Sequence, residues 1–307
     1  MATKVITGLA LGAGGARGLA HIGVIQVLEE EGIPFNVITG SSMGAVVGDI
    51  YCQLRSAGEV EKRFREFINS REFDDSGLGY FRNRRTALEE KGFFKQIATT
   101  IKGRIIINLA QSRDGIIRQE RLSIAIKYLL EPTQFKDHDI VLGVTATDLY
   151  SAELINYTEG EIIPAVIASC SIPGFLPPVK VNGRCLVDGA VACPVPVDLA
   201  GELGANFVIG VGVGQRLYEE RELDNAIDIL ARSELISGFY HSREQLKGAD
   251  VRIFPDTGDT HWSEFKKLEE MVEVGREAAR KSITEIKEKM WELMGFWEKL
   301  KRRLSKV

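Results

Sequence analysis

The sequence predicts a three-layer α/β/α fold with a mostly parallel central sheet, extended by an amphipathic helix at its C-terminal end. Two observations lead to this prediction. Over residues 5–58, apolar strand-like runs alternate with segments of helical periodicity, in the order strand, helix, strand, helix. This order is typical of a parallel sheet covered on both faces by helices. The same alternation returns after residue 140, so the second half of the chain is expected to add strands to the same sheet.

The N-terminal part of the chain contains two strand–helix units. In order, they are a strand at 5–11, a helix at 18–31, a strand at 35–40 and a helix at 42–58. The glycine-rich sequence LGAGGARG at 11–18 separates the first strand from its helix. Gly32 and Pro34 give that helix a stop signal, and Gly58 is expected to end the second one.

The remaining elements follow a less regular segment. Between about residues 55 and 121, basic residues outnumber acidic ones and the apolar clusters are short, which predicts a helical insertion. Strands are then expected at 140–148, 152–160, 185–190, 205–213 and 251–255, and helices at 162–170 and 222–247. We therefore expect one domain over residues 1–281 that contains the insertion at about 55–121, followed by a C-terminal helix at 282–307.

Composition and charge argue against several functional classes. A hydrophobic share of 44%, a charged share of 27% and a net charge of −4 describe a globular chain and argue against a general nucleic-acid binder. The four cysteines and four histidines are scattered, which favours a reducing compartment and predicts neither a metal nor a cofactor. No run approaches the roughly 18 apolar residues of a spanning helix. We expect a cytoplasmic protein, with a signal peptide over residues 4–16 as a minor alternative.

A serine motif lies between the second strand and its helix. The sequence GSSMG at 40–44 has the form G-x-S-x-G, and its central Ser42 falls at a strand-to-helix turn, which is the context that a nucleophilic serine needs. Gly40 and Gly44 would let neighbouring backbone pass close to this turn. The alternative is that Ser41 or Ser42 simply caps the helix.

The glycine-rich loop supplies the hydrogen-bond donors that such a serine needs. Gly14 and Gly15 follow the first strand and precede a helix, so their amides can point toward the end of a neighbouring strand. A dinucleotide-binding loop is the competing interpretation, but Arg17 occupies the sixth position of its G-x-G-x-x-G pattern. A histidine base is a further alternative, for which His241 and His261 are the candidates, although both lie in charged, polar sequence.

Four sequence blocks together closely resemble the patatin-like phospholipases, in particular their compact bacterial members. In order, the blocks are LGAGGARGLAHIGVIQVLEEEGI, GSSMGAVVG, ASCSIPGFLPPV and VDGAVACPVPV, and the resemblance covers about residues 5–215. It implies a serine–aspartate dyad without a catalytic histidine. The nucleophile is carried onto Ser42, the proton acceptor onto Asp188, and the oxyanion hole onto the amides of Gly14 and Gly15.

The resemblance also implies supporting motif positions around these residues, namely Ala13, Ala16, Arg17, Gly18, Gly40, Gly44, Gly189 and Ala190. Ala13 departs from the family, which has glycine there, so we assign the donors to the next two residues. From the residues alone, Asp188 ends an apolar strand at a glycine turn, and a plain Asp-Gly turn is the alternative. Because a free aspartate has a pKa near 3.9, it is a poor base, and the dyad must depend on close positioning.

The C-terminal segment reads as an amphipathic helix with a basic end. Its apolar face comprises Ile283, Ile286, Met290, Leu293, Met294, Trp297, Leu300 and Leu304, widened by Trp291 and Phe296. The basic residues at the end are Lys299, Lys301, Arg302, Arg303 and Lys306. Packing on protein is the favoured interpretation, and peripheral contact with a membrane is the alternative.

These observations lead to one functional prediction, an acyl hydrolase that cleaves phospholipid or lysophospholipid carboxyl esters through an acyl-enzyme, without a metal or cofactor. A general carboxylesterase or thioesterase is the first alternative. A catalytically silent scaffold of the same fold is the second. The sequence does not determine the oligomeric state, the acyl position or the headgroup preference.

Overall fold

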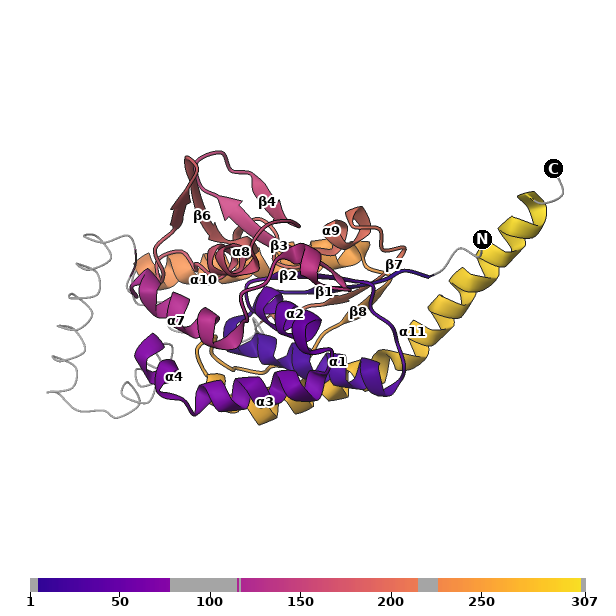
Figure 1. Cartoon of the computed structure of the whole chain (residues 1–307), viewed down its shortest axis with the longest axis horizontal. Helices are drawn as coiled ribbons and strands as arrows, with labels where there is room; N and C mark the ends of the chain where they lie inside the picture. Colours follow the sequence, from indigo (N-terminus) through magenta and orange to yellow (C-terminus); the bar gives the residue numbers. More distant parts are fainter. Residues whose placement is uncertain (1–4, 78–114, 116, 215–225, 305–307) are drawn as a thin grey trace, which may run out of the picture.

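The computed structural model describes residues 5–77, 115, 117–214 and 226–304 (Figure 1). Its strands are β1 (Thr7–Leu11), β2 (Val37–Ser41), β3 (Val141–Asp148), β4 (Leu154–Tyr157), β5 (Val179–Val181), β6 (Arg184–Asp188), β7 (Phe207–Val211) and β8 (Val251–Ile253). Its α-helices are α1 (Ala20–Glu30), α2 (Met43–Leu54), α3 (Ala57–Ile68), α4 (Arg71–Ser76), α7 (Gln119–Leu129), α8 (Ile162–Ser169), α9 (Val197–Glu202), α10 (Ala226–Gln245) and α11 (Leu268–Leu304). A 3₁₀-helix, η1 (Gly15–Leu19), precedes α1.

The strands form one sheet in the order β5-β6-β3-β2-β1-β7-β8, and β4 also pairs with β3. The four pairs from β3 to the β8 edge of the sheet, β2–β3, β1–β2, β1–β7 and β7–β8, are parallel. The pairs β3–β4, β3–β6 and β5–β6 are antiparallel. The sheet is therefore mixed and mostly parallel, as the alternation of elements predicts.

Helices cover both faces of the sheet. Leu9 and Leu11 of β1 point to a large core formed with α1, α2, α3, α7 and α11, whereas Ala10 points to a smaller core with α9 and the segment after α10. This alternation is the two-residue period of a strand that is buried on both faces. Figure 1 shows α1, α2 and α3 below the sheet and α9 above it. The three-layer prediction is confirmed.

Two helix boundaries differ from the sequence prediction. The second helix ends at Leu54 rather than at Gly58, because Arg55 adopts a left-handed conformation (φ 54°) and closes it. Ser56 then caps α3 by accepting a hydrogen bond from the amide of Glu59. Residues 55–77 of the expected insertion are thus two helices packed on the core, and much of its remainder lies outside the described residues.

The last helix also begins earlier than residue 282, at Leu268, and runs to Leu304. It packs along α1 so closely that a side chain on Gly275 would meet the carbonyl oxygen of Ala20 at 1.9 Å. Ile286 is fully buried, and Met290 and Leu293 pack on the core. Packing on protein is therefore correct up to residue 293. No helix within the described ranges is long and apolar enough to cross a bilayer.

Candidate active site

The strand register brings the two candidate dyad residues together. Ser41, the last residue of β2, pairs with Thr145 of β3, and Asp188, the last residue of β6, pairs with the next β3 residue, Ala146. Both strands lie along the same edge of β3, because β4 occupies the opposite edge at these positions. Since β2 runs parallel to β3 and β6 runs antiparallel, their final residues meet end to end. Ser42 follows directly, so it faces Asp188.

Ser42 lies in a sharp turn between β2 and α2. It has a positive φ of 53°, a strained conformation for a residue with a side chain, and it is buried. The turn requires its glycines, because a Cβ on Gly40 would lie 2.4 Å from the amide nitrogen of Ala45 and one on Gly44 2.1 Å from the carbonyl oxygen of Leu11. The amide of Ser42 donates to the hydroxyl of Ser169 at 2.8 Å.

The Asp188 carboxylate is held by two donors. The Ser42 hydroxyl donates to Oδ2 at 2.6 Å, and the amide of Ala190 donates to Oδ1 at 2.8 Å. Burial raises the pKa of this carboxyl from 3.8 to about 6, although both hydrogen bonds oppose the rise. Gly189 leaves no room for a side chain, because a Cβ there would lie 2.5 Å from the carbonyl oxygen of Thr145.

The glycine-rich loop leaves two amides without an acceptor among the described residues. The amides on either side are used: Gly12 donates to Val211, Ala13 to Pro194 and Ala16 to Trp262, each to a carbonyl oxygen. In this part of the chain no acceptor is found for the amides of Gly14 and Gly15. Gly15 has a positive φ of 56° and lines the same cavity as Ser42. Within the described residues, the loop thus leaves two backbone donors unused, and one of them belongs to a residue that lines the cavity next to Ser42.

The side chains of His21 and Met43 contact this loop. His21 is fully buried, and its Nε2 lies 2.7 Å from the carbonyl oxygen of Gly12. Because a carbonyl only accepts, Nε2 carries the proton, and desolvation lowers the pKa of His21 to about 4, so the ring is neutral at pH 7. Gly18 lies against Met43, whose Cγ would be 2.5 Å from a Cβ at residue 18. Arg17 is half-buried, which lowers its pKa to about 10.

A narrow apolar cavity contacts Ser42. Gly15 and Ser42 line it, and the rest of its lining comes from Ile117, from α2, α3 and α7, and from the segments 170–176 and 262–265. Almost all of the lining is apolar, with side chains such as Phe67, Leu122 and Ile172. The volume of the cavity is about 50 Å³, and an apolar lining of this kind suits part of a hydrocarbon chain.

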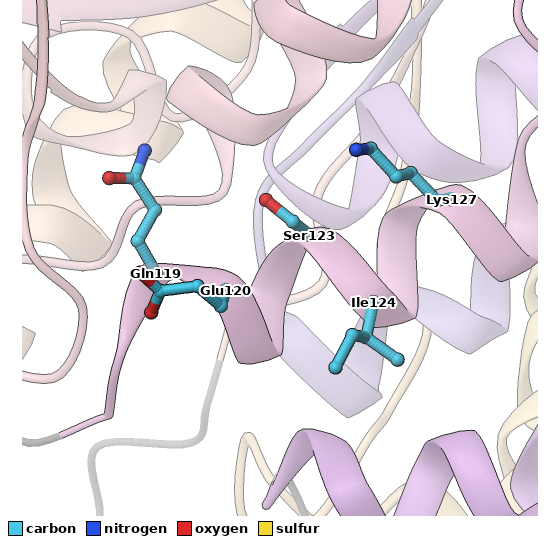
Figure 2. Close-up of a pocket in the computed structure, with 5 residues that line it drawn as sticks. All are labelled: Gln119, Glu120, Ser123, Ile124 and Lys127. Carbon is cyan, nitrogen blue, oxygen red and sulfur yellow. The ribbon is translucent and has the colours of Figure 1, made fainter.

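A second hollow lies on the surface of α7 and is separate from this site. Figure 2 shows the side chains that line it, Gln119, Glu120, Ser123, Ile124 and Lys127, all of which come from this one helix. In this view Gln119, Ser123 and Lys127 extend to one side of the helix and Ile124 extends to the other. None of them contacts Ser42 or Asp188 through a hydrogen bond.

The other polar candidates lie elsewhere. His241 is exposed on α10, and Nδ1 of His261 bonds the hydroxyl of Ser263 at 2.8 Å rather than Ser42. Asp148, a further acidic residue at a strand end, accepts from the amides of Tyr150 and Cys185 at the end of β3. Within the described ranges no group of three histidine, cysteine or acidic residues could hold a metal ion.

The sequence reasoning missed the individual roles of Ser169 and Trp262. Ser169 lies in the block ASCSIPGFLPPV, whose position in the resemblance marks it without indicating which side chain reaches Ser42. Trp262 lies beyond residue 215, where the resemblance ends, and no motif marks it. Only the folded chain brings these two residues to the site.

Fold and site together define an α/β protein with a serine and a carboxylate in contact beside an apolar cavity. A sequence model described as patatin-like phospholipase matches residues 9–200, which is more than half of the chain. The chain belongs to the patatin-like phospholipase family.

Individual relatives agree with this assignment. An uncharacterized NTE family protein of Mycobacterium tuberculosis is 32% identical over 208 residues, which cover 67% of this chain and 48% of the relative. The human patatin-like phospholipase domain-containing protein 6 is 28% identical over 234 residues, or 74% of this chain and 15% of that protein. The chain thus spans about half the length of the mycobacterial relative.

Among solved structures, VipD from Legionella pneumophila has the same fold. The match covers 91% of this chain and 66% of VipD, with a TM-score of 0.50 at 16% identity. At this level of identity the likeness concerns the fold alone.

Proposed function

We propose that this chain hydrolyses the carboxyl esters of phospholipids or lysophospholipids through an acyl-enzyme on Ser42. The observation that supports this most directly is the 2.6 Å hydrogen bond from the Ser42 hydroxyl to Asp188, in a site whose cavity is apolar. A hydroxyl that donates to a buried carboxylate is positioned to lose its proton as it attacks.

The reaction has two halves. Ser42 Oγ attacks the ester carbonyl while its proton passes to Asp188, and the amides of Gly14 and Gly15 donate to the oxygen that becomes negative. The tetrahedral intermediate collapses, the bond to the alcohol breaks, and the alcohol leaves with the proton from Asp188. Water then attacks the acyl-enzyme, gives a proton to Asp188 and releases the fatty acid, with the proton returned to Ser42.

The raised pKa of Asp188 suits this role. A carboxylate with a pKa of about 6 binds the serine proton better than an unperturbed aspartate does, and it is still mostly ionised at pH 7. Desolvation thus supplies basicity that the residue type lacks.

The experiment that tests this proposal combines covalent labelling with lipid turnover. Wild type should react with a fluorophosphonate probe and release fatty acid from phosphatidylcholine or lysophosphatidylcholine in the presence of a chelator. Ser42→Ala should lose both activities. Labelling and turnover that persist in Ser42→Ala would contradict the proposal. Cleavage of a short soluble ester without any lipid turnover would favour a general carboxylesterase.

We further propose a cytoplasmic protein that contacts membranes through the end of α11. Trp291 and Met294 are 72% and 46% exposed, and Figure 1 shows the C-terminal part of α11 projecting away from the sheet. Residues 299–306 of the sequence add five lysines and arginines, and such a helix suits an anionic surface. The side chains after residue 295 lie outside the described part of the structure.

A further inference from the structure

The segment between β8 and α11, residues 254–267, lies against the glycine-rich loop. The amide of Ala16 donates to the carbonyl oxygen of Trp262 at 2.6 Å. A Cβ on Gly15 would lie 2.5 Å from the same oxygen and 2.9 Å from the Cβ of Trp262. Gly15 must therefore be glycine partly because Trp262 is there. The family model ends at residue 200, so this contact lies outside the matched part of the chain.

Trp262 also belongs to the cavity beside Ser42. It lines this cavity together with Gly15 and Phe265. Its ring packs edge-on against Phe175, with ring centroids 4.9 Å apart and planes at 65°, an arrangement that aromatic pairs favour. Phe175 lies six residues after Ser169, whose hydroxyl accepts from the amide of Ser42, so the ring of Trp262 packs on the segment that also contacts the serine.

Local contacts fix the segment that carries Trp262. The amide of His261 donates to Oε2 of Glu264 at 2.7 Å, and its Nδ1 lies 2.8 Å from the hydroxyl of Ser263. Phe265 is buried and packs against the ring of Phe73. Trp262 thus lies between two anchored neighbours, which holds its indole at the cavity wall.

We propose that Trp262 determines acyl-chain specificity, because its indole forms the wall of the acyl cavity next to the glycine-rich loop. This inference rests on the proposed function, since it takes the cavity as the place of the acyl chain. A long acyl chain is buried against the indole, whereas an acetyl group offers little surface to it. The indole therefore contributes binding energy only to long-chain esters.

The test measures kcat and KM of the full chain with p-nitrophenyl acetate and p-nitrophenyl octanoate. Trp262→Ala should lower the octanoate-to-acetate ratio of kcat/KM about tenfold, mainly through a higher KM for octanoate, because contacts that serve substrate and transition state equally change KM. Trp262→Phe keeps an aromatic ring, so its octanoate-to-acetate ratio of kcat/KM should stay within about threefold of the wild-type ratio. Tyr240→Ala, which removes an aromatic ring that is 67% exposed on α10, is the control and should leave the ratio unchanged.

An unchanged ratio in Trp262→Ala would overturn the inference. Equal losses with both esters would also overturn it, because they would mean that the residue acts only by supporting the glycine-rich loop. Trp262→Leu, judged by the same ratio, replaces the alanine variant if circular dichroism shows that the latter does not fold. Failure of the proposed function would appear separately, as hydrolysis of both esters that survives Ser42→Ala.

Discussion

The hydroxyl of Ser42 donates a 2.6 Å hydrogen bond to the carboxylate of Asp188, although the two residues are 146 positions apart in the chain. The contact arises because β2 and β6 end against adjacent residues on one edge of β3. Backbone pairing, rather than a flexible loop, sets the distance between the two side chains.

The first prediction concerns pH. Asp188 must be ionised to accept the serine proton, and burial raises its pKa to about 6. Activity should therefore be lost as the pH falls through about 6, with kcat/KM for a soluble ester decreasing about tenfold per pH unit below it. The rate of fluorophosphonate labelling of Ser42 should decrease with falling pH in the same way. A profile that stays flat down to about pH 4.5 would mean that an unperturbed or different group is the base.

The second prediction concerns the charge of Asp188. Asp188→Asn keeps an acceptor for the amide of Ala190 but cannot take up the serine proton, so kcat should fall by roughly 10²- to 10⁴-fold while the chain still folds. Asp148→Asn is a matched control, because Asp148 is also a buried aspartate at a strand end. Asp148→Asn should lower the melting temperature and leave kcat within a few-fold of the wild-type value. Equal kinetic effects of the two substitutions would argue against a special role of Asp188.

The third prediction concerns the glycine-rich loop. Gly15→Ala places a methyl group 2.5 Å from the carbonyl oxygen of Trp262 at a residue with a φ of 56°, so the loop must shift and its amides must turn. Loss of one oxyanion donor typically costs about 10²- to 10³-fold in kcat, and a loss of that size is expected here, with little change in KM. Gly201→Ala, on a helix with no atom within 4 Å of the new methyl group, should not reduce kcat. A fully active Gly15→Ala would remove this loop from the mechanism.

The fourth prediction concerns the end of α11. A chain that ends at Gly295 keeps Ile286, Met290 and Leu293, which pack on the core, and should keep its activity on a soluble ester. It should lose binding to vesicles that contain phosphatidylserine, measured by flotation, because it lacks the basic end. Neutral phosphatidylcholine vesicles serve as the comparison.

A chain that ends at residue 281 should be less stable, because it lacks Ile286 and part of the core between α1 and α11 is then exposed. It should unfold at a lower urea concentration than the chain that ends at Gly295. If the chain that ends at Gly295 still binds these vesicles, the membrane contact lies elsewhere on the molecule.

The sequence could predict the elements that carry the site but not all of its chemistry. Hydrophobic periodicity and glycine punctuation locate β1, β2, β3 and β6, and four ordered blocks lead to Ser42 and Asp188 before any coordinates. The pKa of Asp188 could not be predicted in this way, because it depends on burial by segments from several parts of the chain. The end of α2 was predicted wrongly, since nothing in the residue type of Arg55 indicates a left-handed backbone.

Long-range packing accounts for the other differences. Leu268 begins α11 where the sequence shows only a charged, partly apolar stretch, and the close contact of Gly275 with α1 depends on tertiary structure. Trp262 reaches the glycine-rich loop through a segment more than two hundred positions away in sequence, and no local pattern encodes such a contact.

The end-to-end arrangement of β2 and β6 also bears on how chains of this kind can diverge. A slip of β6 by one residue along β3 would move Asp188 by about 3.4 Å and turn its side chain to the other face of the sheet. The turns at 149–153 and 182–183 lie beyond the paired residues, so insertions there leave the register unchanged. β3 contributes neither the serine nor the aspartate, yet of all the strands it should tolerate insertions and deletions least.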